Sequence, residues 1–151
     1  MRRLVVAGLL LVAPAALSAP PSPAQVVKYR HAVMGGLGAH MAGLSMIVKG
    51  ESDRAGDALA HATAVKDLSH TIGALFPEGT GPSTEFETSA KPEIWSQHDK
   101  FVEAVKALET SSDALVEAAK SNDPAKLKTA LGAVGRSCGD CHDAFKVDDH
   151  H

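Results

Sequence analysis

Apolar residues recur at steps of three and four along most of the chain after its first 25 residues, which is the spacing of helices with one buried face. The first such stretch predicts a helix from Val26 to Lys49, stopped by Gly50. No segment shows the two-residue alternation of a half-buried strand. The apolar side of this first helix contains Val26, Val27, Met34, Leu37, Met41, Leu44 and Val48.

Three further helices follow. The second is predicted to begin at a cap, Ser52 or Asp53, and to end before Pro77, because proline is poorly tolerated inside a helix. Residues 77–91 lack periodicity and form the long connection. Pro92 suits the first turn of a third helix. Its buried stripe is predicted to be Ile94, Phe101, Val105, Leu108, Leu115 and Ala118.

The break before the last helix is Asn122-Asp123-Pro124, in which Asp123 is the expected cap and Pro124 the first helical residue. The fourth helix then continues to Phe145 with the same apolar period. Four amphipathic helices joined by short first and third connections predict an all-α fold, an antiparallel four-helix bundle.

The amino terminus is typical of an export signal. Arg2 and Arg3 precede the apolar run from Leu4 to Val12, and small residues follow. We expect a signal peptide over residues 1–24, cleaved after Ser18 or after Ala24, and a single bundle domain over residues 25–151. An uncleaved anchor is the alternative, although the run is shorter than the ~20 residues of a membrane helix. The expected location is the periplasm.

Charge and hydropathy argue against a nucleic-acid partner and against a membrane span in the mature chain. The formal net charge is −3 and the basic residues are scattered, so we expect no nucleic-acid partner. No segment after the leader is expected to be apolar enough to cross a bilayer, so the mature form should have no membrane span.

The only two cysteines of the chain lie in the run Cys138-Gly139-Asp140-Cys141-His142. A Cys-x-x-Cys-His run is the attachment pattern of a c-type haem, in which the thiols bond to the haem and the histidine binds the iron. A disulfide framework normally uses more cysteines, and zinc needs a second ligand cluster. A thioredoxin-like pair would begin a helix rather than lie near its end.

The cysteines and the histidine of this run sit at positions i, i+3 and i+4 of the fourth helix, so they share one face. We therefore expect one covalent haem c per chain, held by Cys138 and Cys141, with His142 as the iron ligand.

Five segments of the chain, in order, share a pattern with one haem-protein family. They are Val27-Lys28-Tyr29-Arg30, Val48-Lys49-Gly50-Glu51, Leu75-Phe76-Pro77-Glu78-Gly79-Thr80, Ala90-Lys91-Pro92-Glu93-Ile94-Trp95, and Val134-Gly135-Arg136-Ser137-Cys138 continued through Lys146. Taken together, these segments resemble the cytochromes c′, the class II c-type cytochromes, over most of the mature chain. The resemblance implies a bundle that is usually dimeric, with a pentacoordinate, high-spin iron whose closed distal side admits small uncharged gases such as NO and CO.

The resemblance also implies roles for four other residues that carry polar or charged groups. Arg30 matches an arginine near a haem propionate, a pairing that suits a guanidinium; the alternative is a solvated charge. His31 stands where many members have glutamine, and either bonds a propionate or faces water. Ser89 matches a loop position that contacts the haem, or is plain loop. Lys146 stands where the family often has arginine, where it would restrain a gas on the proximal face or face solvent.

Met34 matches the bulky residue that covers the distal face of the iron. An apolar cover excludes water and offers bound O₂ no hydrogen-bond donor. Methionine is also a haem ligand, and the low-spin class II cytochromes place theirs at much the same position. Ordinary core filling is the third reading.

The expected function is therefore a pentacoordinate haem protein that binds NO and CO and takes part in electron transfer with unidentified periplasmic partners. The alternative is a six-coordinate electron carrier with Met34 as sixth ligand. We expect no enzymatic turnover, since no distal acid–base pair is present unless His31 reaches over the iron. A homodimer is expected from the resemblance and from the apolar first helix, which contains Gly35, Gly36 and Gly38.

Overall fold

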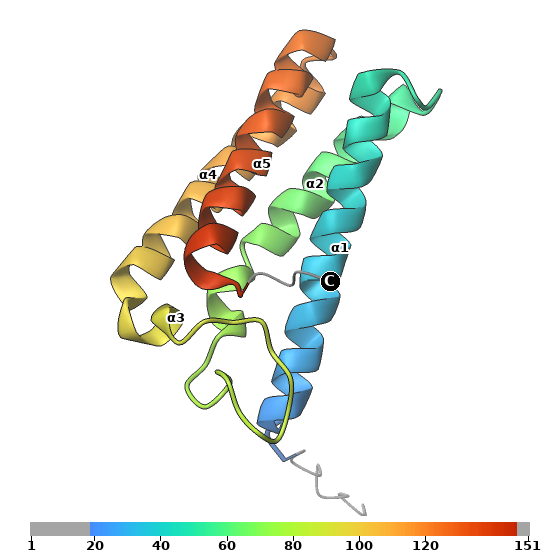
Figure 1. The fold of residues 1–151 in the computed structure, drawn as a ribbon. Helices are drawn as coiled ribbons and strands as arrows, with labels where there is room; N and C mark the ends of the chain where they lie inside the picture. The colour runs from blue at the N-terminus through green and yellow to red at the C-terminus, as the bar shows by residue number, and fades with distance from the viewer. Residues whose placement is uncertain (1–18, 148–151) are drawn as a thin grey trace, which may run out of the picture.

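The computed structural model describes residues 19–147; the apolar run of the expected leader and the last four residues lie outside it. Within that range the chain is helical and contains no β-strand, which confirms the all-α prediction (Figure 1). The four long helices are α1 (Pro23–Lys49), α2 (Ala58–Ser69), α4 (His98–Lys120) and α5 (Pro124–Phe145). The short elements are η1 (Ala55–Asp57), η2 (Ile72–Leu75) and α3 (Glu93–Ser96).

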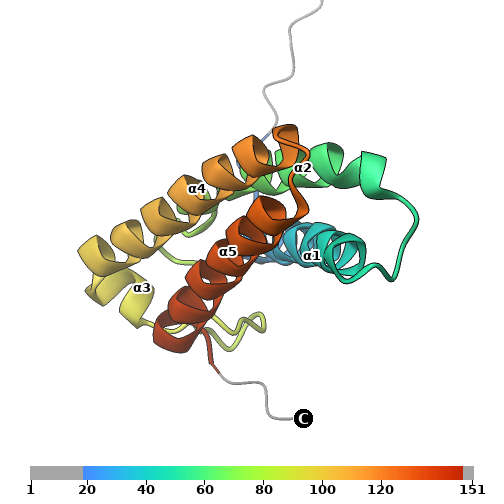
Figure 2. The same cartoon turned by 90° about the horizontal axis from the view of Figure 1, so that it is seen from above.

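Successive long helices run in opposite directions, as predicted. α1 leads to the end of the bundle where the α4–α5 turn also lies, and α2 returns to the end that holds the long loop (Figure 1). α2 packs against α1 on one side and α4 on the other, and α4 packs against α5 (Figure 2). α1 and α5 make fewer direct contacts, so space is left between them for something other than helix–helix packing.

α1 begins three residues earlier than predicted. Ser22 caps it, because the Ser22 hydroxyl accepts a hydrogen bond from the Gln25 amide while the Gln25 side chain accepts one from the Ser22 amide. Pro23 occupies the first turn, where a missing N–H costs nothing. The expected stop at Gly50 is confirmed: its φ of 72° is the left-handed conformation that ends many helices.

The predicted second helix is shorter than expected, and its proposed caps are wrong. α2 begins at Ala58, after the 3₁₀ turn η1, and neither element has a side-chain cap. Ser52 instead accepts a hydrogen bond from the Arg54 amide in the preceding turn. The end of the predicted helix, up to Leu75, forms the separate 3₁₀ turn η2. The apolar spacing continues across the break between α2 and η2, so the sequence pattern did not indicate that break.

The predicted third helix is divided. Pro92 lies directly before the single turn α3, and Gln97, with φ −122° and ψ 44°, separates that turn from α4. The last helix begins as predicted: an Asp123 side-chain oxygen accepts hydrogen bonds from the amides of Ala125 and Lys126, and Pro124 follows the cap.

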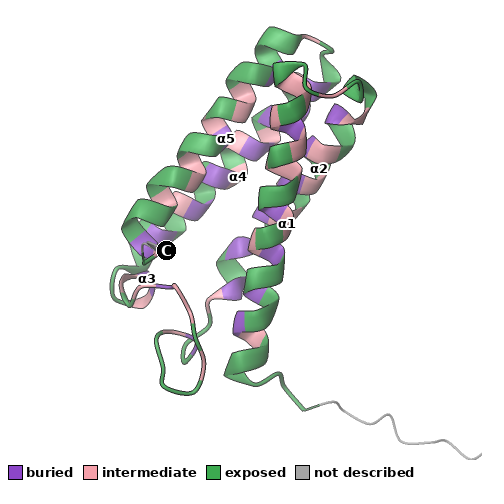
Figure 3. Cartoon of the chain, turned by 45° about the vertical axis from the view of Figure 1, so that its right-hand side comes forward, coloured by how far each residue is buried: buried purple, intermediate pink, exposed green. Residues whose placement is uncertain are grey.

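The buried residues of the four long helices face one another along the bundle axis (Figure 3). Leu44, Val65, Leu115 and Val134 are fully buried, one from each long helix. By length and composition alone α1 could cross a membrane, which corrects the expectation that no segment after the leader is apolar enough. The buried residues of α1 pack in the bundle core, but the apolar window is only 17% buried, so length and composition alone do not establish a membrane span.

Candidate functional site

The Cys-x-x-Cys-His run lies in the last two turns of α5. Cys138 and Cys141 are half-buried and carry free thiols, and both pack against the core. His142 is exposed, yet it lines the same cavities as Cys141. The predicted convergence of these three residues on one face of the helix is therefore what the structure shows.

Two adjoining cavities open beside this face, between α1 and α5. Their volumes are about 160 Å³ and 300 Å³, and they share Met34, Ile72, Cys141 and His142 as lining residues. The larger one is apolar apart from the motif itself. Its other lining residues are Leu37, Gly38, Met41, Val65, Ala104, Val105, Leu108, Val134 and Gly135, together with Cys138.

The apolar surroundings control protonation at the motif. Burial, together with a smaller effect of the neighbouring Cys138, raises the pKa of Cys141 to about 11. Burial likewise raises the pKa of Cys138. Partial burial, followed by the positive charge of Lys146, lowers the pKa of His142. The site therefore favours two neutral thiols and a neutral imidazole, the form in which a histidine can bind a metal.

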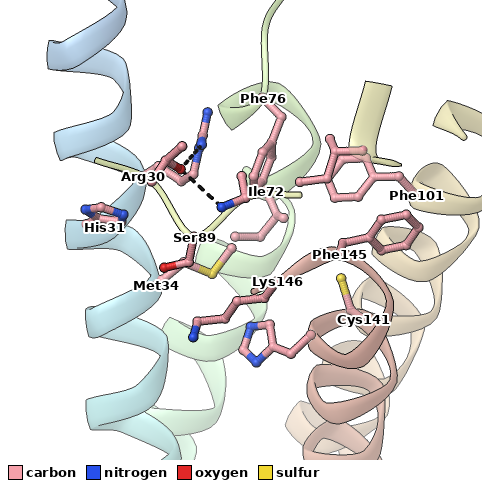
Figure 4. Close-up of a pocket in the computed structure, with 14 residues that line it drawn as sticks. Arg30, His31, Met34, Ile72, Phe76, Ser89, Phe101, Cys141, Phe145 and Lys146 are labelled. Atoms are coloured by element: carbon pink, nitrogen blue, oxygen red, sulfur yellow. Dashed lines mark hydrogen bonds between the residues drawn. The ribbon is translucent and has the colours of Figure 1, made fainter. Parts of the chain in front are cut away.

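Met34 projects from α1 into the cavity, toward the side from which Cys141 enters (Figure 4). It is partly buried and packs against the core. Gly38, one turn later on α1, lines the same cavity, and no atom lies within 4 Å of the position its Cβ would take. On the α1 side, the cavity is thus bordered by the flexible apolar side chain of Met34 and by the backbone at Gly38, which no side chain covers.

Arg30 is 3% exposed and connects α1 to the loop that follows η2. Its Nε donates to the Leu75 carbonyl at 3.0 Å, and Nη2 donates to the Thr80 hydroxyl at 2.6 Å. Both Nη atoms also reach the Thr80 carbonyl at 3.3 Å, and Nη1 reaches the Thr88 hydroxyl at 3.2 Å. The guanidinium carbon lies 4.1 Å from the centre of the Phe76 ring.

No carboxylate of residues 19–147 forms an ion pair with Arg30, and burial lowers its pKa. A buried cation without an anion is costly, so a negatively charged group from outside the chain would be favourable here. Arg30 lines the same cavity as His142. The sequence-based alternative of a solvated charge is wrong.

The long loop is fastened to the end of α5. The Lys91 amide donates to the Phe145 carbonyl at 2.9 Å, and the Val147 amide donates to the Ser89 carbonyl at 2.8 Å. Ser89 and Lys146 both line the cavity beside this pairing, so the structure brings both predicted positions to its edge (Figure 4). Lys91 Nζ also donates to the Asp143 carbonyl at 2.9 Å.

His31 also lines the cavity but is exposed, on the turn of α1 between Arg30 and Met34. Its place is the rim. One wall of the cavity is aromatic and is formed by Phe76, Phe101 and Phe145. The rings are in edge-to-face contact, with the centre of Phe101 4.9 Å from that of Phe76 and 5.5 Å from that of Phe145. Phe101 was predicted to face inward and Phe145 to end the apolar period of the last helix, but their pairing with Phe76 depends on the path of the loop.

The residues present fit a c-type haem. The thiols and imidazole converge, the cavity is apolar where a porphyrin needs burial, and the uncompensated Arg30 charge suits a propionate. Residues 25–146 match the family model described as Cytochrome C′. The chain belongs to the cytochrome c′ family.

Relatives agree over nearly the whole chain. Cytochrome c′ of Pararhodospirillum photometricum is 38% identical over 126 residues, which cover 83% of this chain and 98% of that protein. A nitric oxide complex of a leucine-to-alanine variant of Alcaligenes xylosoxidans cytochrome c prime has a TM-score of 0.78 and 32% identity, covering 87% and 100% of the two chains. Another structure of that protein has carbon monoxide bound.

A third solved structure is a cytochrome c′ described as having an unusual ligand-controlled dimer dissociation. It has a TM-score of 0.80 and 25% identity to this chain, and the match covers 86% of this chain and all of that one.

Proposed function

We propose that this chain is a periplasmic c-type haem protein that binds NO and CO and passes electrons, with one covalent haem per chain. The observation that carries the proposal is the apolar cavity closed by Met34 on α1 and by Cys138, Cys141 and His142 on α5. The bound haem iron would supply the ligand-binding and redox chemistry. The relatives from Alcaligenes xylosoxidans with NO or CO support the choice of ligands.

The protein's own residues would set selectivity on the distal side. Met34, Leu37 and Met41 offer no hydrogen-bond donor there, so bound O₂ would gain no polar stabilisation, whereas NO and CO need none. Because Met34 projects into the cavity, we expect an entering ligand to displace it. The exposed His31 lies at the rim, which supports binding and electron transfer over peroxidase-like turnover.

Met34 also supports a second candidate function. It is the one thioether that lines both cavities, together with His142. If its sulfur bound the iron, the protein would be a six-coordinate electron carrier. The ferric optical and EPR spectra separate the two functions, because a pentacoordinate iron gives high-spin signals and a methionine ligand gives low-spin signals.

Replacing Met34 with alanine tests the gate directly. We expect the CO association rate of the ferrous protein to rise at least tenfold, which corresponds to roughly 1.4 kcal/mol of barrier. Met46→Ala is the matched control, since Met46 lies on the same helix but is 47% exposed and lines neither cavity. Stopped-flow mixing with CO makes the measurement; equal rates in the wild type and Met34→Ala would show that Met34 is not the gate.

We also propose export with cleavage after Ser18. Cleavage there keeps the Ser22 cap and Pro23 of α1, whereas cleavage after Ala24 removes both. Loss of a serine cap costs about 1 kcal/mol of helix stability, so the earlier cut leaves the better-formed helix.

A further inference from the structure

Two histidines on neighbouring helices meet outside the haem cavity. His40 of α1 and His61 of α2 have their Nδ1 atoms 2.9 Å apart, and their ring centres are 5.2 Å apart at an angle of 62°. Both rings are half-buried, and neither residue lines either cavity of the haem site. The proposed haem chemistry therefore leaves this pair unused.

A glycine makes the approach possible. A Cβ at Gly43 would lie 2.9 Å from Cε1 of His61, closer than real Cβ atoms come to other atoms, and 3.1 Å from Nε2, a tight contact. Gly43 is one turn beyond His40 on α1, so the His61 ring rests against α1 backbone that any larger residue would cover. The pocket for the second imidazole is thus formed by the α1–α2 packing itself.

The contact has a specific chemical requirement. At 2.9 Å the two Nδ1 atoms must share one proton, donated by one ring to the lone pair of the other. A metal ion about 2.0–2.1 Å from each nitrogen would lie to one side of the line that joins them, so both rings must rotate to aim their lone pairs at it. Neighbouring nitrogens in the tetragonal geometry of Cu²⁺ lie about 2.8–2.9 Å apart, and those around tetrahedral Zn²⁺ about 3.3 Å apart. The observed separation of 2.9 Å therefore suits two adjacent ligands of Cu²⁺.

We propose that His40 and His61 form a binding site for a divalent first-row transition metal ion, with Cu²⁺ held most tightly. Imidazole suits this class of ion, and Cu²⁺ stands at the top of its affinity order. Within residues 19–147 no third histidine, cysteine or carboxylate completes the group, so water fills the remaining positions. Asp57, one turn before His61, is already paired with Arg54 at 2.8 Å.

Metal binding would join α1 to α2 and stabilise the folded chain by mass action. Protons compete for the same nitrogens, so binding weakens on acidification. Because the site does not use the haem iron or its ligands, the proposal stands or falls independently of the gas-binding function.

The test is isothermal titration of the exported, haem-loaded protein with Cu²⁺ after treatment with EDTA. All proteins carry His150→Gln and His151→Gln, so that the terminal histidines cannot bind. We expect one Cu²⁺ per chain, two nitrogen couplings in its EPR spectrum, and at least a tenfold loss of affinity in His40→Gln and in His61→Gln. His98→Gln is the control, an exposed histidine at the start of α4, and should leave the affinity unchanged.

A second variant guards against a folding artefact. Gly43→Ala keeps both imidazoles but displaces the His61 ring, so it should also weaken Cu²⁺ binding while circular dichroism stays helical. Equal Cu²⁺ affinity in the parent protein, His40→Gln and Gly43→Ala would overturn the proposal.

Discussion

Arg30 combines two tasks at the edge of the cavity. Its five hydrogen bonds go to neutral acceptors on η2 and the long loop, while no carboxylate of residues 19–147 pairs with its charge. The hydrogen bonds fix the loop that closes the cavity, and the free charge suits a haem propionate. A single side chain therefore links the fold of the loop to the cofactor site.

Substitution of Arg30 should expose both tasks. Arg30→Met leaves the carbonyls of Leu75 and Thr80 without their buried donors, and each unsatisfied group costs about 1–3 kcal/mol. We expect urea unfolding of the holoprotein to show a loss of at least ~2 kcal/mol. Arg30→Lys keeps the positive charge but loses the planar, forked set of donors of the guanidinium. It should change the reduction potential of the haem less than Arg30→Met does.

The outcome that would contradict this account is simple. If Arg30→Met matched the wild type in urea midpoint and in reduction potential, Arg30 would be neither the anchor of the loop nor a partner of the cofactor.

For individual residues, the sequence predicted the haem-attachment group better than it predicted which distant side chains contact one another. Cys138, Cys141 and His142 follow from a local pattern, because their spacing alone puts them on one helical face. The Thr80 acceptor of Arg30 and the contact of Gly43 with His61 join residues far apart in the chain. A single sequence carries no signal for such pairs beyond the residue types themselves.

Helix caps decide where the elements begin. Asp123 receives two amide hydrogen bonds at the start of α5, whereas Asp53, one of the two expected caps of the second helix, lies before a 3₁₀ turn that has no side-chain cap. Pro124 after Asp123 marks that helix start in the sequence, whereas no proline follows Asp53.

This difference is measurable. Asp123→Ala should lower the free energy of unfolding by about 1 kcal/mol, and Asp53→Ala should change it little. Chemical denaturation of both variants provides the comparison. Equal losses would mean that the cap at α5 contributes nothing particular to stability.

Element boundaries were predicted well where a strong terminator stands and poorly where it does not. Gly50 and Pro124 mark their positions through backbone sterics, whereas α2 ends at Ser69, well before the expected stop at Pro77. The break at Gln97 has no proline or glycine to mark it. The chain changes direction there, because α3 packs against α5 before α4 begins. Tertiary contacts, rather than local preference, place it.

The whole molecule exposes apolar side chains on the two helices that begin the bundle. Met46 of α1 and Leu59 of α2 are 47% and 41% exposed. Gly35, Gly36 and Gly38 lie on α1. A Cβ at Gly36 would lie 3.4 Å from Leu68 of α2, whereas a Cβ at Gly35 or Gly38 would have no neighbour within 4 Å. We propose that α1 and α2 form the interface of a homodimer.

Sedimentation velocity at micromolar concentration should then give the mass of two chains. Met46→Lys and Leu59→Lys should shift the protein toward a monomer, because a buried charge at an interface is costly. Val102→Lys is the control, at an equally exposed apolar position on α4. A wild type that sediments as one chain, or a control that dissociates like the test variants, would contradict this interface.

The central claim is that a haem is covalently held by the last helix and fills the space between α1 and α5. Intact mass spectrometry of the protein, exported by cells with active c-type maturation, tests it most directly. We predict one mass, equal to a chain that begins at Ala19 plus one haem, and loss of the haem in Cys138→Ala/Cys141→Ala. A wild-type chain without added haem, from cells that load another c-type cytochrome, would contradict the claim.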